Sequence, residues 1–402
     1  MKTAGIICEY NPFHLGHAFH IESTRRMLGE DTAVVCVMSG NFVQRGDFAL
    51  FNKHARAKIA VLCGADLVVE LPSPYALSSA ERFASAGVHL LDSLNICDFI
   101  SFGSESGDVG ALGEAAEAIV SKPVDAKTRE WLDKGLSYAV ARQKAADAVL
   151  GARSGLFLSP NNLLGIEYLK AIAKSHSKLI PVTVKRTGAA HDSDTGCSAS
   201  AIRKMLLERD VAQGISSAWD HMPSAAAGIF SEEIDSGRGP VSMITCELAI
   251  LSRLRAMSDY SYLPDASEGL DHRLARYAAS EATVTEVLER VKTKRYAMSR
   301  IRRMLICACL GISAGDSCGP PPYIRVLAMN RIGMKLLKES QNRTQTPVIV
   351  KPASAKKLSG QAGDIFRKEA AATDFYSLAY PAQSKRTGGQ EWRTGPVIIE
   401  HR

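Results

Sequence analysis

The chain has 402 residues, of which 46% are hydrophobic and 23% charged, the usage of a folded globular protein. This excludes a disordered or fibrous chain, and the absence of any run of about 18 apolar residues argues against a membrane span. The net charge of +7 is uneven: residues 1–200 carry 20 basic and 21 acidic residues, and residues 201–402 carry 29 and 21. This asymmetry predicts a catalytic front half joined to a region that binds a polyanion, although charge that only favours solubility gives the same count.

The start of the chain and its cysteines indicate a cellular compartment. The segment MKTAGIICEYNPFH contains an apolar stretch too short for a signal peptide. The nine cysteines are an odd number without a CxxC pair, which favours neither a disulfide framework nor a zinc site. We therefore expect a soluble, cytoplasmic protein without a metal site of its own.

Short β-rich runs alternate with helical patterns through the front half. They predict strands at residues 3–8, 33–38, 67–71, 99–102 and 179–185 and helices at residues 15–28, 53–63, 76–94, 161–175 and 199–208, with a helical stretch at 107–149. This order predicts an α/β fold with a Rossmann-like parallel sheet covered by helices. Ligands of such sheets bind at the carboxyl ends of the strands.

The alternation fades beyond residue 215. Helical patterns dominate residues 241–258, 270–310 and 324–338. We therefore predict two domains, a catalytic α/β domain over residues 1–215 and a mainly helical, basic region over residues 216–402.

A turn between the first strand and the first helix contains two histidines in the order His-x-Gly-His. His14 and His17 are three residues apart, so both face the same side and can donate to phosphate oxygens. The helix that begins near Leu15 directs free N–H groups and its positive dipole end at the same place. Such groups stabilise charge on an α-phosphate and on leaving pyrophosphate, which predicts nucleotidyl transfer without a covalent nucleophile. Together with His20 the pair could instead bind a metal, but no fitting carboxylate or cysteine lies nearby.

A second motif, SASAIR at residues 198–203, begins the last predicted helix of the front half. Serine at a helix start is commonly an N-cap, which is the purely structural interpretation. The functional interpretation is a second anion site, in which Ser200 and Arg203 hold the β- and γ-phosphates and Lys185 and Arg186 add positive charge. We predict that His14, His17, Ser200 and Arg203 are catalytic.

These motifs and the strings around them resemble the tRNA(Met) cytidine acetate ligase family of the HxGH nucleotidyltransferase superfamily. The likeness is dense over residues 3–205, in strings such as GIICEYNPFHLGHAFH, FGSESGD, SPNNLLGIEYLKAI and IPVTVKRTG, and thinner in KRYAMSRIRRML and PYIRVLAMN. Cys8 stands where a small residue is expected, and Ser200 stands where Thr is expected.

The resemblance implies that ATP activates acetate to acetyl-adenylate and that the acetyl group passes to N4 of the wobble cytidine, C34, of elongator tRNA(Met). It implies an ATP site formed by Gly103, Asn161, Arg186 and the loop Ile7, Cys8, Glu9, Tyr10, Asn11, Pro12, Phe13, His14, Leu15, Gly16, His17, Ala18, Phe19 and His20. ATP normally carries Mg²⁺. Neither DNA nor a membrane is an expected partner.

The polar block Ser39–Gly46 and the basic back half each allow a functional and a purely structural interpretation. We expect the block to lie over the nucleotide or the acetate. The alternative is that it is only a structural turn. Residues 291–340 hold ten Lys or Arg against two acids, and we expect Arg295, Arg302 and Arg303 to form a basic helix face for tRNA. The alternative is a solvated face, with tRNA bound elsewhere, around Lys351, Lys356 and Lys357.

Two other functions fit parts of the sequence. A small-molecule adenylyltransferase shares the HxGH chemistry but does not need a long basic second domain. A non-catalytic RNA-binding protein with a nucleotide-binding fold has no need to retain both histidines, Ser200 and Arg203. Both alternatives are therefore less favoured than the acetate ligase.

Overall fold

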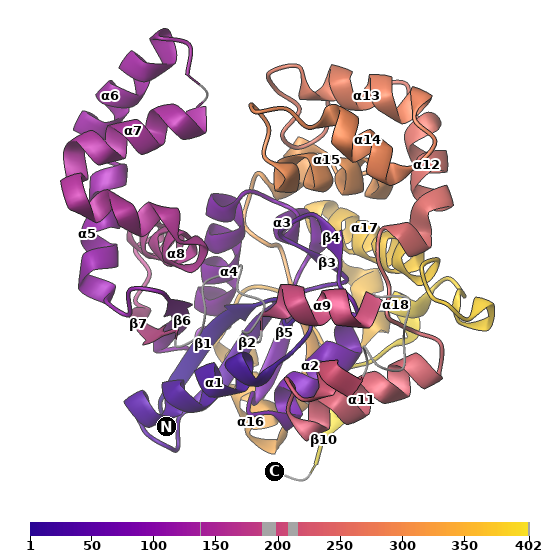
Figure 1. The fold of residues 1–402 in the computed structure, drawn as a ribbon. Helices are drawn as coiled ribbons and strands as arrows, with labels where there is room; N and C mark the ends of the chain where they lie inside the picture. Colours follow the sequence, from indigo (N-terminus) through magenta and orange to yellow (C-terminus); the bar gives the residue numbers. More distant parts are fainter. Residues whose placement is uncertain (137, 187–197, 208–215, 401–402) are drawn as a thin grey trace.

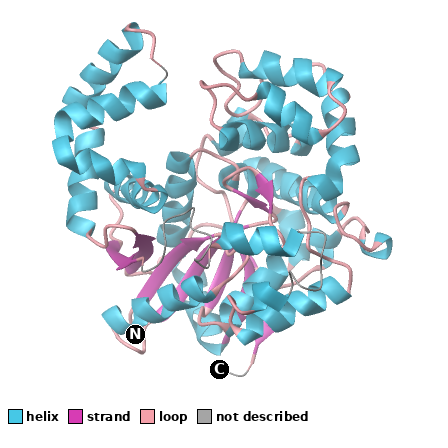
Figure 2. Cartoon of the chain, viewed as in Figure 1, coloured by secondary structure: helices cyan, strands magenta, loops and turns pink. Residues whose placement is uncertain are grey.

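A computed structural model describes residues 1–136, 138–186, 198–207 and 216–400 of the chain. A central sheet has helices on both faces, an arm of helices rises from one edge, and a separate helical lobe stands opposite the arm (Figure 1). Helices predominate outside the sheet (Figure 2). Among the described residues, no helix is both long and apolar enough to cross a membrane.

Within the described ranges the central sheet has eight strands. The path is β10-β8-β5-β2-β1-β6-β7, and β9 pairs with β8. The pairs β5–β2, β2–β1, β1–β6 and β6–β7 are parallel, and β8 runs antiparallel to β5. The bounds are Thr3–Cys8 for β1, Ala33–Ser39 for β2, Leu67–Leu71 for β5, Phe99–Ser104 for β6, Ile180–Lys185 for β7, Ile324–Asn330 for β8, Val348–Ile349 for β9 and Val397–Ile399 for β10. All strands predicted in the front half are confirmed.

The two faces of strand β2 belong to two different hydrophobic cores. Val35 and Val37 pack in one core with α4 (Ala80–Leu94), α8 (Pro160–Ser175) and α16 (Arg331–Arg343). Val34 and Cys36 pack in the other core with α1 (Leu15–Leu28), α2 (Lys53–Leu62), α9 (Ala199–Leu207) and α11 (Ser224–Asp235). Successive side chains of a strand point to opposite faces, so a continuous apolar run is what a sheet covered on both sides requires.

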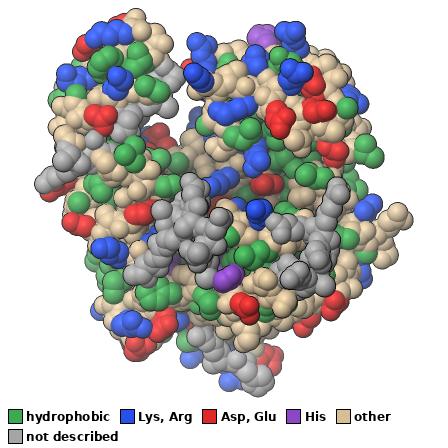
Figure 3. All heavy atoms as spheres, viewed as in Figure 1, with side chains coloured by type: hydrophobic (Ala, Val, Ile, Leu, Met, Phe, Trp, Pro, Cys, Tyr) green, Lys and Arg blue, Asp and Glu red, His purple; other side chains and the backbone are tan. Residues whose placement is uncertain are grey.

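The arm and the lobe lie on either side of a hollow above the sheet. The arm consists of α5 (Val109–Ile119), α6 (Lys122–Asp133) and α7 (Tyr138–Leu150) (Figure 1). The lobe consists of α12 (Glu247–Arg255), α13 (Leu270–Ser280), α14 (Val284–Val291) and α15 (Met298–Leu310), which share a third core with α17 (Gly360–Ser377). Figure 3 shows Lys and Arg side chains along the side of the lobe that faces the hollow.

The back half is mainly helical, as predicted, but it also completes the sheet. The helix expected at residues 324–338 is wrong in its first part, because Ile324–Asn330 is the fully buried strand β8. A short apolar run does not distinguish a buried strand from a buried helix. Helix α16 then begins at Arg331, where the Asn330 side chain accepts a hydrogen bond from the Gly333 N–H. The predicted domain boundary, residue 215, lies outside the described residues, and the sheet takes strands from both sides of it.

Candidate active site

The loop between β1 and α1 folds around its two histidines. His14 is the N-cap of α1, and its Nδ1 accepts a hydrogen bond from the Gly16 N–H at 3.0 Å. In return, Nδ1 of His17 accepts from the His14 N–H at 3.2 Å. This is a capping box formed by two imidazoles instead of the usual Ser or Thr with Glu. The rings stack with centroids 3.8 Å apart, and the edge of Tyr10 supports His17 at 4.9 Å.

The same contacts fix which nitrogen of each ring carries the proton. Burial, followed by the charges of Arg186, Arg203 and His221, lowers the pKa of His14 to about 4. Burial and neighbouring cations also lower the pKa of His17 well below its usual value. Both rings are therefore neutral at pH 7, and because each Nδ1 accepts a bond, each Nε2 carries the hydrogen. The loop thus holds two neutral Nε2–H donors.

The expectation of free N–H groups at the start of α1 is wrong. Leu15 N–H donates to the carbonyl of His221 at 3.0 Å, Gly16 N–H donates to His14, and His17 N–H donates to the His14 carbonyl at 2.9 Å. An imidazole cap and a carbonyl from a distant segment take the donors that a bare helix end would offer. An anion at this place is therefore met by imidazole and guanidinium groups together with the helix dipole.

Ser200 and Arg203 lie beside the histidine loop, as the pairing of the two motifs predicts. The guanidinium of Arg203 donates to the Asn11 carbonyl at 2.7 Å and to the Ser200 hydroxyl at 2.8 Å. Ser198 supplies the N-terminal cap, with its hydroxyl accepting from the Ala201 N–H at 3.2 Å. The purely structural interpretation of this motif therefore holds for Ser198, whereas Ser200 contacts Arg203, and Arg203 contacts the histidine loop.

Gly103 and Arg186 lie together at the carboxyl ends of β6 and β7. A Cβ on Gly103 would lie 3.5 Å from Cγ of Arg186, and the backbone N–H of Arg186 donates to the Ser104 carbonyl at 2.9 Å. Arg186 is exposed, and its charge lowers the pKa of all three histidines of the loop. The sheet therefore brings the β1, β6 and β7 ends together, where the sequence predicts the ATP site.

Asn161 is in the first turn of α8, and its side chain is bound to Glu105, a residue that the sequence analysis missed. The Asn161 amide nitrogen donates to Oε1 of Glu105 at 2.6 Å, and the Asn162 N–H donates to Oε2 at 2.8 Å. A carboxylate at a helix N-terminus is a favourable cap. The string FGSESGD contains this acid next to Gly103, and its place directly after a strand was the available signal.

Most residues of the loop Ile7–His20 are buried or half-buried and support the site from inside the fold. Tyr10, Asn11, Phe13 and His14 are buried, whereas only Leu15, Gly16 and Phe19 are exposed. Pro12 follows a cis peptide bond and is also buried. Ile7, Cys8, Glu9, His17, Ala18 and His20 are half-buried. His20 bonds the Ser101 hydroxyl at 3.0 Å, which explains this third histidine without a metal.

The polar block Ser39–Gly46 forms a small hairpin beside the site. The block contains strand β3 (Phe42–Val43) and the turn, and strand β4 (Asp47–Phe48) follows it. Oε1 of Glu9 accepts from the Gln44 N–H at 2.6 Å, so the block is fixed to the histidine loop. The buried Arg56 also joins the two segments, because its Nη1 donates to the carbonyls of Glu9 at 2.6 Å and Ser39 at 3.2 Å.

The predicted basic face for tRNA is only partly correct. Arg295 precedes α15 instead of lying on it, and Arg303 is buried, with Nη2 bound to Asp265 at 3.2 Å and Nη1 bound to the Gln44 carbonyl at 3.4 Å. The apolar residues of α15 face the lobe core, and Arg303 lies on the buried side of the helix. Arg302 remains 40% exposed.

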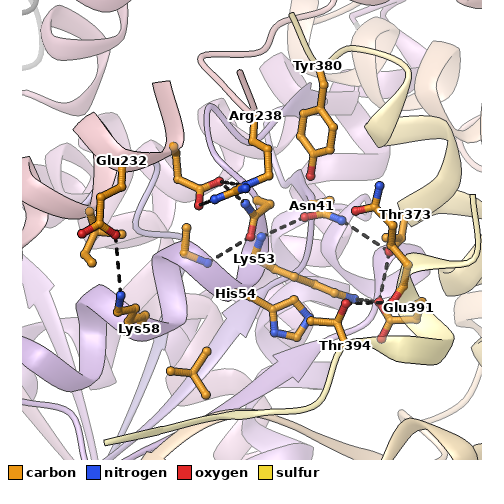
Figure 4. Close-up of a pocket in the computed structure, with 16 residues that line it drawn as sticks. Asn41, Lys53, His54, Lys58, Glu232, Arg238, Thr373, Tyr380, Glu391 and Thr394 are labelled. Atoms are coloured by element: carbon orange, nitrogen blue, oxygen red, sulfur yellow. Dashed lines mark hydrogen bonds and ion pairs between the residues drawn. The ribbon is translucent and has the colours of Figure 1, made fainter. Parts of the chain in front are cut away.

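A pocket of about 330 Å³ lies elsewhere, between α2, α11 and the C-terminal segment, and contains none of the predicted catalytic or ATP-site residues, although Asn41 of the polar block lines it (Figure 4). Its cations are paired with acids: Lys53 with Glu391 at 2.7 Å, and Arg238 with Glu233 at 2.7 Å. A phosphate would find no uncompensated positive charge among these pairs, so the pocket is a poor nucleotide site.

Among the described residues, no group of three or more His, Cys, Asp or Glu side chains could hold a metal ion. Any Mg²⁺ that ATP carries would therefore be held mainly by the phosphates and water.

Fold and site together define the class of the protein. A family model described as HIGH nucleotidyl transferase matches residues 1–391. The parallel sheet, the histidine loop at the end of β1 and the cations around it are those of a nucleotidyl transferase.

Full-length relatives define the family more narrowly. The tRNA(Met) cytidine acetate ligase of Acetivibrio thermocellus is 37% identical, over 99% of this chain and 100% of the relative. The one of Caldanaerobacter subterraneus subsp. tengcongensis is 39% identical, over 94% and 96%. The crystal structure of Thermotoga maritima TmcAL bound with alpha-thio ATP aligns with a TM-score of 0.92 and 30% identity over 100% of both chains. The chain therefore belongs to the tRNA(Met) cytidine acetate ligase family.

Proposed function

We propose that the protein uses ATP to convert acetate to acetyl-adenylate at the histidine loop and transfers the acetyl group to N4 of the wobble cytidine of elongator tRNA(Met), in the cytoplasm. The observation that carries the proposal is the pair of neutral Nε2–H donors on His14 and His17, fixed beside Arg186 and Arg203. The names of the full-length relatives specify acetate and tRNA(Met).

In the first step, an acetate oxygen attacks the α-phosphorus of ATP. The bond from that phosphorus to the oxygen that bridges the α- and β-phosphates breaks, and pyrophosphate leaves. Negative charge grows on the α-phosphate oxygens and on the leaving group. Hydrogen bonds from His14 and His17 and the charges of Arg186 and Arg203 stabilise that charge better in the transition state than in the ground state.

In the second step, N4 of the cytidine attacks the acetyl carbon. The bond from that carbon to the oxygen on phosphorus breaks, AMP leaves with that oxygen, and N4 loses a proton. No protein nucleophile is needed. Cys8, in the same loop, is not suited to be one, because burial and its neighbour Cys36 raise the pKa of its thiol well above the usual value.

We also propose that the front half supplies the acetate-activating groups and that the back half supplies the surface for tRNA. The basic composition of residues 201–402 and the Lys and Arg side chains on the side of the lobe facing the hollow support this division (Figure 3). Each phosphate contact releases counterions, so affinity for tRNA should fall as salt rises.

The test is ATP–pyrophosphate exchange in the absence of tRNA, measured with and without acetate. We expect exchange to require acetate. Exchange that ignores acetate and requires a nucleotide acceptor instead would favour a small-molecule adenylyltransferase.

A further inference from the structure

Arg302 belongs to the back half but extends to the edge of the histidine site. Its Nη1 lies 3.8 Å from Oδ2 of Asp47, the residue with which strand β4 begins. The Nε–H of Arg302 is buried and donates to no acceptor among the residues that the structure describes. The side chain as a whole is 40% exposed, so a ligand can reach its outer nitrogens.

The turn that carries Asp47 is locked against the backbone of α15. Gly46 has φ +76, and a Cβ at this position would lie 2.3 Å from the backbone nitrogen of Arg303 and 2.6 Å from the carbonyl carbon of Arg302. Only glycine allows both this conformation and this approach. Arg303 adds its contact with the Gln44 carbonyl. The position of Arg302 relative to the histidine loop is therefore set by direct packing.

Arg203 is affected by charged side chains of both signs. After burial, the pKa of Arg203 is affected by the charges of Asp47, Glu9, Arg45 and Arg302, which places all four near its side chain. Glu9 is already engaged by the Gln44 N–H and by the Ser39 hydroxyl at 3.3 Å. Two guanidinium groups, Arg203 and Arg302, therefore share one carboxylate, Asp47, near Asn11 of the histidine loop, to which Arg203 is bonded.

We propose that Arg302 binds the β- and γ-phosphates of ATP together with Arg203, so that a helix of the back half contributes to the leaving-group side of acetate activation. This inference rests on the proposed ATP site. The partly exposed guanidinium of Arg302 matches a phosphate, to which arginine can donate two parallel bonds.

The experiment compares the affinities of Arg302→Ala and wild-type protein for ATP and for AMP, by titration calorimetry without tRNA. We expect ATP affinity to fall about tenfold, as for loss of a charged hydrogen bond, and AMP affinity to stay the same, because AMP lacks the two outer phosphates. The control is Arg290→Ala, which removes the same charge from an exposed position of α14. Unchanged ATP affinity, or an equal loss for ATP and AMP, would overturn the proposal.

A second variant should change the affinity for ATP in the opposite direction. Asp47→Asn keeps the shape of the side chain and removes the negative charge near Arg203 and Arg302. We expect ATP to bind several-fold more tightly, and weaker binding would contradict the proposal. A variant Arg302→Ala that binds tRNA less well but ATP normally would instead assign this arginine to tRNA. Calorimetry with ATP requires no acetate, so the two proposals are tested separately. A protein without acetate-dependent exchange would contradict the proposed function but would not decide the role of Arg302.

Discussion

Two charged regions of this molecule show opposite uses of charge. Around Lys53, the ammonium group contacts Glu70 at 2.6 Å, Glu391 at 2.7 Å and Glu369 at 3.5 Å, and all four side chains are at most 1% exposed. At the histidine site, the hydrogen bonds that the structure gives Arg203 go to a carbonyl and a hydroxyl, which are neutral acceptors. The first region compensates its charge internally, whereas we propose that the second keeps positive charge for a ligand.

The two regions differ because of the elements that supply the partners of their cations. Glu70 is on β5, whereas Glu369 and Glu391 come from α17 and α18 (Gln390–Arg393), so the Lys53 cluster joins the two halves of the chain. Burial opposes a charge on Lys53, yet the carboxylates, Glu391 first among them, raise its pKa. Compensated charge that is fully buried has a structural role, whereas cations at the open ends of strands are available to bind an anion.

The largest expected effect is on stability, at Lys53. Lys53→Met should lower the free energy of unfolding by about 3–5 kcal/mol, because it leaves buried carboxylates without their cation. Urea denaturation measures this. The control is Lys58→Met on the same helix, whose side chain is 36% exposed and 3.8 Å from Glu232. That exposed pair should contribute less than about 1 kcal/mol. Equal effects of the two variants would show that burial of the cluster does not matter.

The next effect is on catalysis, at His17. His17→Ala should lower acetate-dependent exchange by about 10²–10³, the usual loss for one transition-state donor. The loss of its capping bond should cost only about 1 kcal/mol of stability. His272→Ala, at a histidine 91% exposed in the lobe, is the control and should be fully active. A folded His17→Ala protein with full activity would exclude His17 from the mechanism.

A smaller effect is expected at Arg186. Arg186→Ala should weaken ATP binding about tenfold, because an exposed cation beside the histidines is lost. Lys178→Ala is the matched control, because it removes the same charge from an exposed position just before β7. Titration of each variant with ATP decides the matter. Equal losses in both would indicate a general effect of charge instead of a site.

The last effect is a pH dependence of stability, which is small over a single pH unit. The pKa of His14 and of His20 is lowered to about 4 in the folded protein, below the unfolded value of 6.5. The unfolded chain therefore binds protons first as pH falls, and the stabilisation present above pH 6.5 is lost between pH 6.5 and 4. Each histidine should cost about 1 kcal/mol per pH unit in that window. His20→Gln should reduce the slope in urea denaturation, and a slope that His20→Gln leaves unchanged would contradict the assigned pKa.

Local signals made the front half predictable. The apolar strands, the helix caps and the contiguous motifs at residues 14–17 and 198–203 depend on neighbours in sequence, and the structure places them together. Contacts between distant segments were not predictable. Tertiary packing sets three of these contacts. The His221 carbonyl accepts from the Leu15 N–H, and Arg303 is buried against the Gln44 turn. Lys53 forms ion pairs with Glu369 and Glu391. Strand β8 was missed because its short apolar run has no distinguishing period.

The central claim is that acetate attacks the α-phosphate directly at the histidine site. The most direct measurement supplies acetate labelled with ¹⁸O in both oxygens, together with ATP and tRNA, and determines by mass spectrometry where the label goes. Formation of acetyl-adenylate followed by acyl transfer predicts AMP with one ¹⁸O atom and acetylated cytidine with the other. Unlabelled AMP, formed at the same rate as acetylated tRNA, would contradict the account.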